Sequence, residues 1–173
     1  MSSNTGPVPG DVFDVKNLDL QAEFNVVRPF TYSHFDSVAN YTHYNQPLAH
    51  PLGANFRESV GIVRYQPSPR WSGQLKVIWW KQGLDSANSN LGSNIFKLNT
   101  TRSHGDYGYD MLGGVSSQGL NTSGLVSFEW KENLFLDGSL MYRHFTKEGF
   151  STENTLMFTL GVRVNMFRRE YDY

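Results

Sequence analysis

The stretch Leu156-Met-Phe-Thr-Leu-Gly-Val-Arg-Val-Asn-Met166 decides the fold, because apolar and mostly polar positions alternate along it without a break. One set of positions is wholly apolar, whereas the other holds Thr159, Gly161 and Arg163. A period of two predicts a strand with one apolar and one mostly polar face. The chain then closes on an aromatic residue, Tyr173, which favours the last strand of an outer-membrane β-barrel.

Further segments with the same alternation precede this strand. They cover residues 18–26, 56–66, 71–80, 122–130 and 134–143. The connections between them alternate in length, with long loops at 31–54 and 83–118, tight turns at 67–70 and 131–133, and a medium loop at 146–153. A short strand extension is predicted around residues 95–98. Short turns at one end and long loops at the other are typical of bacterial outer-membrane barrels. The sequence thus predicts an all-β antiparallel meander of about six transmembrane strands, part of a larger barrel.

Composition permits this fold without requiring it. No apolar run is long enough for a transmembrane helix. Aromatic residues reach 14%, which suits both membrane interfaces and the strands of a soluble β-domain. A net charge of -1 argues against a nucleic-acid partner, and the absence of cysteine excludes disulfides and thiolate metal sites. A soluble ligand-binding β-domain therefore remains an alternative, although a second sheet would have to cover the uncharged face of the last strand.

Charged residues occupy the predicted inner face of the sheet. The alternation of segment 56–66 is ambiguous, and we place Glu58 and Arg64 inward. The full inward set is Glu23, Glu58, Arg64, Lys76, Glu129, Asp137, Arg143 and Arg163. Because both signs are present, we expect cross-strand pairing rather than an open pore, which favours one dominant sign. A diffusion pore stays an alternative and predicts conductance in a bilayer.

Three segments resemble a known family: Leu18–His34, Asn40–Phe56 with its core Asn45-Gln-Pro-Leu-Ala-His-Pro-Leu-Gly53, and Val162–Tyr173. They are similar to the capsule-assembly Wzi-like barrels of Bacteroidetes, a group that includes gliding-motility RemB-like proteins. The resemblance implies an outer-membrane location and a precursor with a signal peptide, absent from this sequence. It also implies a barrel of more than six strands.

We therefore expect residues 1–16 to be a flexible segment and residues 17–173 to be the C-terminal portion of the barrel domain. Barrels of this class start at roughly eight strands, and unpaired strand edges are costly in lipid. The missing N-terminal strands of the same barrel are expected to close the sheet. Outer-membrane lipid and surface polysaccharide are the other expected partners.

The expected function is non-enzymatic attachment or assembly of capsular or extracellular polysaccharide, with a gliding-motility component as the alternative within the family. No cofactor is expected. Several histidines share the first long loop, but their spacing matches no compact metal motif, so no metal site is predicted. Ser33, His34 and Asp36 are sequence neighbours and no nucleophile elbow is present, so no catalytic residue is predicted. Candidate ligand-binding residues are His43, Asn45, Gln46 and His50 in the loop, and Arg64, Lys76, Arg143 and Arg163 on the inner face.

Overall fold

The sheet of this protein follows the order of the chain. The computed structural model describes residues 15–36, 39–44 and 46–165. They form one antiparallel sheet of six strands, in the order β1-β4-β5-β6-β7-β8, and a separate pair, β2-β3. The strands are β1 (Leu18–Val27), β2 (Thr42–His43), β3 (Gln46–Pro47), β4 (Phe56–Ser68), β5 (Trp71–Leu84), β6 (Val115–Lys131), β7 (Leu134–Lys147) and β8 (Glu153–Val164). The predicted all-β antiparallel meander is confirmed.

Several strands are longer than predicted. The expected loop 83–118 is too long, because Gly83 pairs with Ser116 and Leu84 with Val115, which extends β5 and β6. Backbone pairing continues here through small and polar residues, which give no apolar alternation to read. The strand extension predicted around residues 95–98 is also wrong, because these residues belong to no strand and are followed by a short 3-10 turn at Asn99–Thr101.

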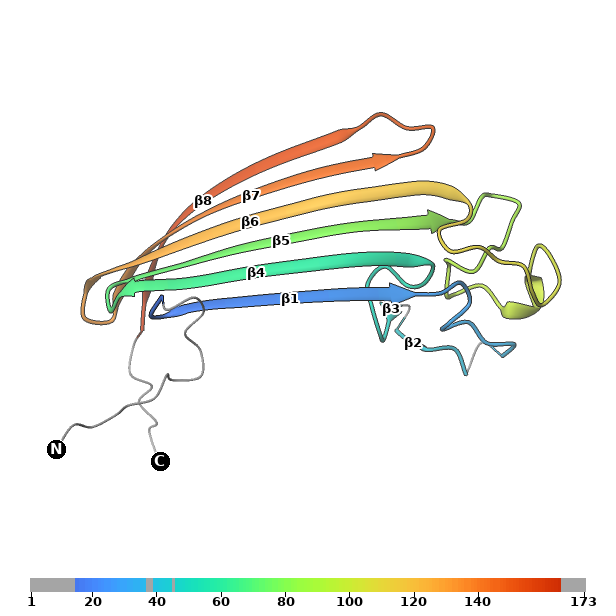
Figure 1. The fold of residues 1–173 in the computed structure, drawn as a ribbon, viewed down its shortest axis with the longest axis horizontal. Helices are drawn as coiled ribbons and strands as arrows, with labels where there is room; N and C mark the ends of the chain where they lie inside the picture. Colours follow the sequence, from blue (N-terminus) through green and yellow to red (C-terminus); the bar gives the residue numbers. More distant parts are fainter. Residues whose placement is uncertain (1–14, 37–38, 45, 166–173) are drawn as a thin grey trace, which may run out of the picture.

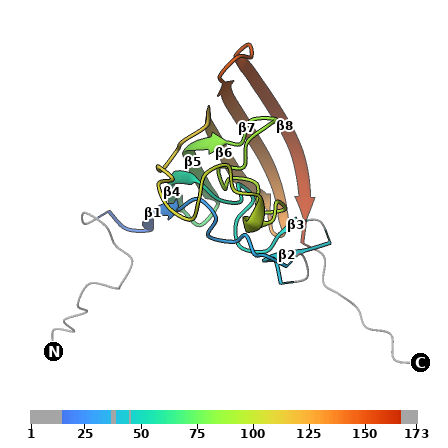
Figure 2. The same ribbon diagram turned by 90° about the vertical axis from the view of Figure 1, so that its right-hand side faces the viewer.

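The long connections gather at one end of the sheet, and the turns between β4 and β5 and between β6 and β7 lie at the other (Figure 1). Seen end-on, the sheet curves as an arch from β1 to β8, with the β2-β3 pair beneath its concave side (Figure 2). We call residues 28–36, 39–44, 46–55 and 85–114 the loop lobe. This lobe therefore stands at one end of a long curved sheet.

Cross-strand register sorts the side chains into the two predicted faces. One row of neighbours consists of Leu20, Val63, Leu75, Gly124, Leu140 and Phe158. The adjacent row on the other face consists of Asp19, Arg64, Gln74, Leu125, Ser139 and Thr159. The prediction that Glu58 and Arg64 share the polar face is confirmed, because these residues pair with Asn25 and Asp19 of β1.

The apolar face is open to its surroundings. Its exposed large side chains are Leu20, Phe24, Val26, Val63, Tyr65, Trp71, Leu75, Trp79, Val126, Leu136, Leu140, Tyr142, Leu156, Phe158, Leu160, Val162 and Val164. Exposure reaches 73% at Leu160. On the polar face of the sheet, Leu125, Met141 and Met157 are the comparably exposed apolar residues of the described strands. Within the described residues, no helix is long and apolar enough to cross a membrane.

The buried core lies where the loop lobe meets the sheet. Ala54 and Phe56 are fully buried, and Ile95 is 2% exposed. The two long connections are joined by backbone hydrogen bonds, such as Phe30 N–H to the Gly92 carbonyl at 3.0 Å and Asn99 N–H to the His34 carbonyl at 3.1 Å. The predicted loops thus form an ordered lobe with its own small core.

Some predicted features lie outside the described residues. These are most of the predicted flexible segment 1–16, the loop candidate Asn45, and the end of the chain from Met166 to Tyr173.

Candidate functional site

A cavity of about 400 Å³ opens where the loop lobe meets the polar face of the sheet. Its polar lining residues are Glu23, His50, Glu58, Lys76 and Asn121. Its apolar and aromatic lining residues are Pro51, Leu52, Val60, Ile62, Ile78 and Trp80. This volume falls in the range of roughly 300–1,000 Å³ that is typical of ligand pockets, which are mostly apolar with a few placed polar groups.

The register of four strands brings these residues together. Glu23, Val60, Ile78 and Asn121 are successive neighbours in one row across β1, β4, β5 and β6. Lys76 and Trp80 lie two positions to either side of Ile78 on β5, and therefore project from the same face. Sheet pairing alone assembles the floor of the pocket.

His50 joins the loop lobe to this floor. Its Nε2 lies 3.0 Å from Glu58 Oε2, and Asn25 Nδ2 donates to the same oxygen at 3.1 Å. His50 Nδ1 accepts a hydrogen bond from the Leu52 backbone N–H at 3.2 Å. A neutral ring in this arrangement carries its proton on Nε2 and donates it to Glu58. The imidazole also stacks on Phe56, with ring centroids 4.4 Å apart.

Trp80 lies directly over a glycine of the neighbouring strand. A Cβ atom at Gly119 would fall 2.6–2.7 Å from the indole atoms Cε2, Cζ2 and Nε1 of Trp80. Three ring atoms at nearly equal distance place the face of the indole on the backbone of β6. Phe145 flanks the ring, with centroids 6.0 Å apart. The absence of a side chain at Gly119 therefore leaves the space that the Trp80 ring occupies.

Gly119→Ala is expected to displace the Trp80 ring and to destabilise the protein by about 1–3 kcal/mol, because the added methyl group overpacks this contact. The emission of Trp80, in a background where Trp71, Trp79 and Trp130 are phenylalanine, should shift together with the unfolding midpoint. Gly124→Ala is the matched control on the same strand, because a Cβ there meets no atom within 4 Å. Equal behaviour of the two variants would contradict the contact.

The cations of the polar face differ in their partners. Arg64 pairs with Asp19 at 2.8 Å and Arg163 with Asp137 at 2.9 Å, so cross-strand pairing is confirmed for these two residues. Arg143 lies over the ring of Phe145, 5.5 Å from its centroid. Lys76 is half-buried and makes no ion pair or hydrogen bond with any described residue. The expected pairing therefore does not extend to Lys76, which lines the pocket instead.

The predicted site residues separate into several places. His50 and Lys76 come together in the pocket, whereas His43 and Gln46 face each other in the β2-β3 pair. His43 packs edge-on against Tyr44, with ring centroids 4.2 Å apart. Among the residues that the structure describes, no group of three His, Cys, Asp or Glu side chains could hold a metal ion.

Sequence reasoning missed Trp80 and Asn121 as site residues. The signal for Trp80 was present, since two consecutive tryptophans on a strand must place one ring on each face. Asn121 gave no comparable signal, because its role depends on the pairing of β6 with Ile78 of β5.

Two buried amides hold the roof of the pocket in place. Asn55 Nδ2 donates to the carbonyls of Gly83 at 2.8 Å and Gly113 at 2.9 Å, and Asn55 Oδ1 accepts from Leu112 N–H at 2.7 Å. Gln82 Nε2 donates to the Ala54 carbonyl at 2.9 Å. These bonds fix the chain on the C-terminal side of the segment that carries His50.

Comparison with known proteins identified no relative: no family model, curated protein or solved structure matches this chain.

Proposed function

We propose that this protein is part of an outer-membrane β-barrel and acts, without catalysis, in the attachment or assembly of extracellular polysaccharide at the cell surface. One observation carries the proposal. All six strands of the sheet present a continuous apolar face whose side chains are exposed. A face of this extent needs an apolar environment, and lipid supplies one along the whole length of a strand.

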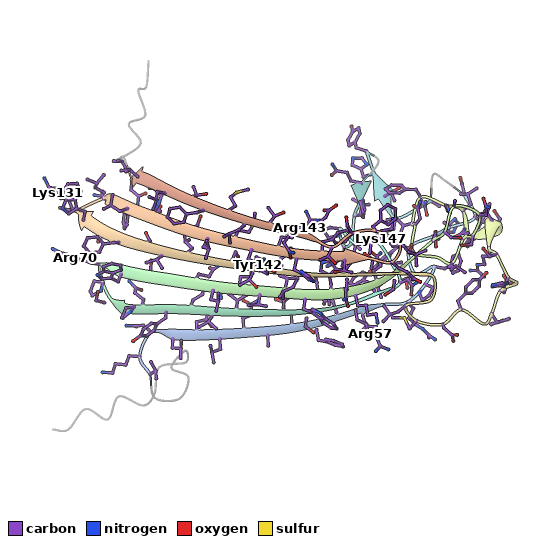
Figure 3. All side chains as sticks on the ribbon, turned by 90° about the horizontal axis from the view of Figure 1, so that it is seen from above. Arg57, Arg70, Lys131, Tyr142, Arg143 and Lys147 are labelled. Atoms are coloured by element: carbon purple, nitrogen blue, oxygen red, sulfur yellow. The ribbon has the colours of Figure 1, made fainter. Side chains whose placement is uncertain are left out.

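The ends of the apolar face fit a membrane boundary. On β5 the segment between the outward-facing Trp71 and Trp79 has about the length, roughly 9–11 residues, that a tilted strand needs to cross. Aromatic residues at both ends match the interfacial positions that tryptophan prefers. Arg70 and Lys131 lie at the turn end and Arg57 near the lobe end (Figure 3). Basic side chains there could reach the polar headgroups.

The lengths of the connections support an orientation with the loop lobe outside the cell. Long loops of outer-membrane barrels are extracellular and short turns periplasmic, which would place the loop lobe outside the cell. Tyr44 and Tyr107 of this lobe are 89% and 91% exposed. Exposed aromatic rings offer apolar faces on which sugar rings can stack. The edges of the sheet, β1 and β8, would pair with further strands to complete the barrel.

The resemblance of Leu18–His34 and Asn40–Phe56 to Wzi-like barrels supports polysaccharide rather than another surface ligand. In the producing organism, loss of the gene is expected to move polysaccharide from the cells to the medium. The double variant Tyr44→Ser and Tyr107→Ser should restore retention only in part, since each ring contact is worth about 1 kcal/mol. The partition is measured as hexose in washed cells and in supernatant.

Phenylalanine at both positions is the matched control for this experiment, because it keeps the rings and removes only the hydroxyls. It should restore retention fully. Recovery of the protein in the soluble fraction of lysed cells, or an unchanged polysaccharide partition in the deletion strain, would contradict the proposal. Loss of colony spreading with unchanged retention would instead support the gliding alternative.

A further inference from the structure

We propose that the pocket beneath the loop lobe binds one neutral, hydroxyl-rich sugar ring. Trp80 is the stacking platform, and Glu23, Lys76 and Asn121 form the hydrogen bonds. The inference rests on the proposed function, because a surface polysaccharide is the source of such a ring. It adds a binding site within the arch of the sheet, separate from the exposed tyrosines of the lobe.

The stacking platform is already in position. One face of the Trp80 indole lies on Gly119, and Trp80 also lines the cavity, so the ring borders the space that a ligand would fill. Apolar side chains of the sheet, such as Ile78, continue this surface. A pyranose ring has an apolar C–H face that suits a flat aromatic surface, and a fixed indole loses little entropy on binding.

The polar lining matches hydroxyl groups. Glu58 is already held by His50 and Asn25. Glu23 receives a hydrogen bond from Gln21 on Oε1 alone, so its Oε2 has no partner among the described residues. Lys76 and the side chain of Asn121 likewise bond to no described residue. The pocket therefore offers an acceptor in Glu23, a donor in Lys76, and both in the amide of Asn121. A sugar hydroxyl can donate and accept hydrogen bonds, so it can pair with each of these groups.

The charge of the lining argues for a neutral ligand. The lining carries both signs, with the carboxylates of Glu23 and Glu58 beside the ammonium of Lys76. An anionic sugar would meet the like charges of Glu23 and Glu58, and a cationic sugar would meet the like charge of Lys76. A neutral polyol can use all three groups without repulsion.

The test is saturation-transfer NMR with methyl β-D-glucopyranoside, on full-length protein extracted from outer membranes in dodecyl-dimethylamine oxide. This detergent carries no sugar, whereas alkyl glucosides and maltosides would compete for the site. Trp80→Leu is expected to weaken binding about tenfold through loss of the stacking surface. Trp79→Leu is the matched control, because its ring projects from the opposite, apolar face. It should bind as the unmodified protein does.

A second pair of variants leaves the packing of the aromatic residues intact. Lys76→Gln is expected to weaken binding several-fold, whereas Lys81→Gln, on the apolar face of the same strand, should leave it unchanged. Glucuronate and protonated glucosamine are the charged probes and should bind more weakly than the neutral glucoside.

Absence of glucoside binding, preference for either charged sugar, or equal losses in the two tryptophan variants would each overturn the inference. The proposed function is tested by different measurements, the polysaccharide partition and the cell fractionation. Retention of polysaccharide without glucoside binding would contradict sugar binding in the pocket and leave the proposed function standing. Glucoside binding by a protein found in the soluble fraction would contradict the proposed outer-membrane location and leave sugar binding in the pocket standing.

Discussion

Arginine in place of Leu140 is expected to destabilise the protein in a bilayer by about 2–4 kcal/mol, the cost of an arginine on the lipid face near the membrane midplane. Leu140 belongs to the row that runs through the middle of the apolar face, between Gly124 and Phe158. In water the same change at an exposed position would alter stability by only about 0.5 kcal/mol. The size of the effect therefore reports the medium that surrounds this face.

Met141→Arg is the matched control for Leu140→Arg. The two residues are adjacent and apolar, with exposures of 41% at Met141 and 49% at Leu140, but they lie on opposite faces of β7. Only Leu140→Arg should lower the urea midpoint of folding into lipid vesicles and reduce the amount of protein in the outer membrane. Similar effects of the two substitutions would show that the faces do not differ in environment.

Asn55→Asp is expected to destabilise the loop lobe by about 2–4 kcal/mol and so to unfold it, because the substitution leaves buried backbone carbonyls without their donor. The substitution keeps the size of the side chain, but it replaces a donor to two carbonyls with a carboxylate. Asn55 is fully buried, so the carbonyls of Gly83 and Gly113 would face an acceptor without water to compensate. The backbone at Asn55 has a φ of 58°, a conformation that asparagine and aspartate both tolerate. The loss would thus come from the hydrogen bonds.

Hydrogen exchange and limited proteolysis of the lobe measure this effect. Amides between residues 85 and 114 should lose protection in Asn55→Asp, while the central strands keep theirs. Asn88→Asp is the control, because Asn88 is exposed in the same lobe and its side chain bonds to no described residue. A lobe that stays protected in Asn55→Asp would contradict the anchoring role of Asn55.

The faces of the sheet could be predicted because alternation is a local property. Each residue of β8 reveals its face through its immediate neighbours, and pairing with β7 leaves that assignment unchanged. The loop lobe could not be predicted in the same way. Asn55 bonds to carbonyls 28 and 58 residues away, and no local pattern encodes contacts at such separations. Ordinary polar composition therefore indicated a loop where the chain forms a small core.

The candidate site was predictable only in part for the same reason. Alternation places Lys76 on the polar face, and the loop histidines mark a segment with side chains that can bond. The contact of His50 with Glu58 depends on the path of the loop lobe. The flat placement of the Trp80 ring depends on Gly119 in the paired strand. Both facts follow from register and tertiary packing, which a single segment does not contain.

The bond between His50 and Glu58 joins the loop lobe to the floor of the pocket. His50 is in the roof and Glu58 in the floor, so a ligand between them contacts two parts whose relative position this bond maintains. Linkage makes any such coupling reciprocal. If filling the pocket stiffens the lobe, a surface partner that orders the lobe must strengthen the pocket's hold on its ligand by the same factor. A ligand in the pocket and a partner on the loop lobe would then be held cooperatively.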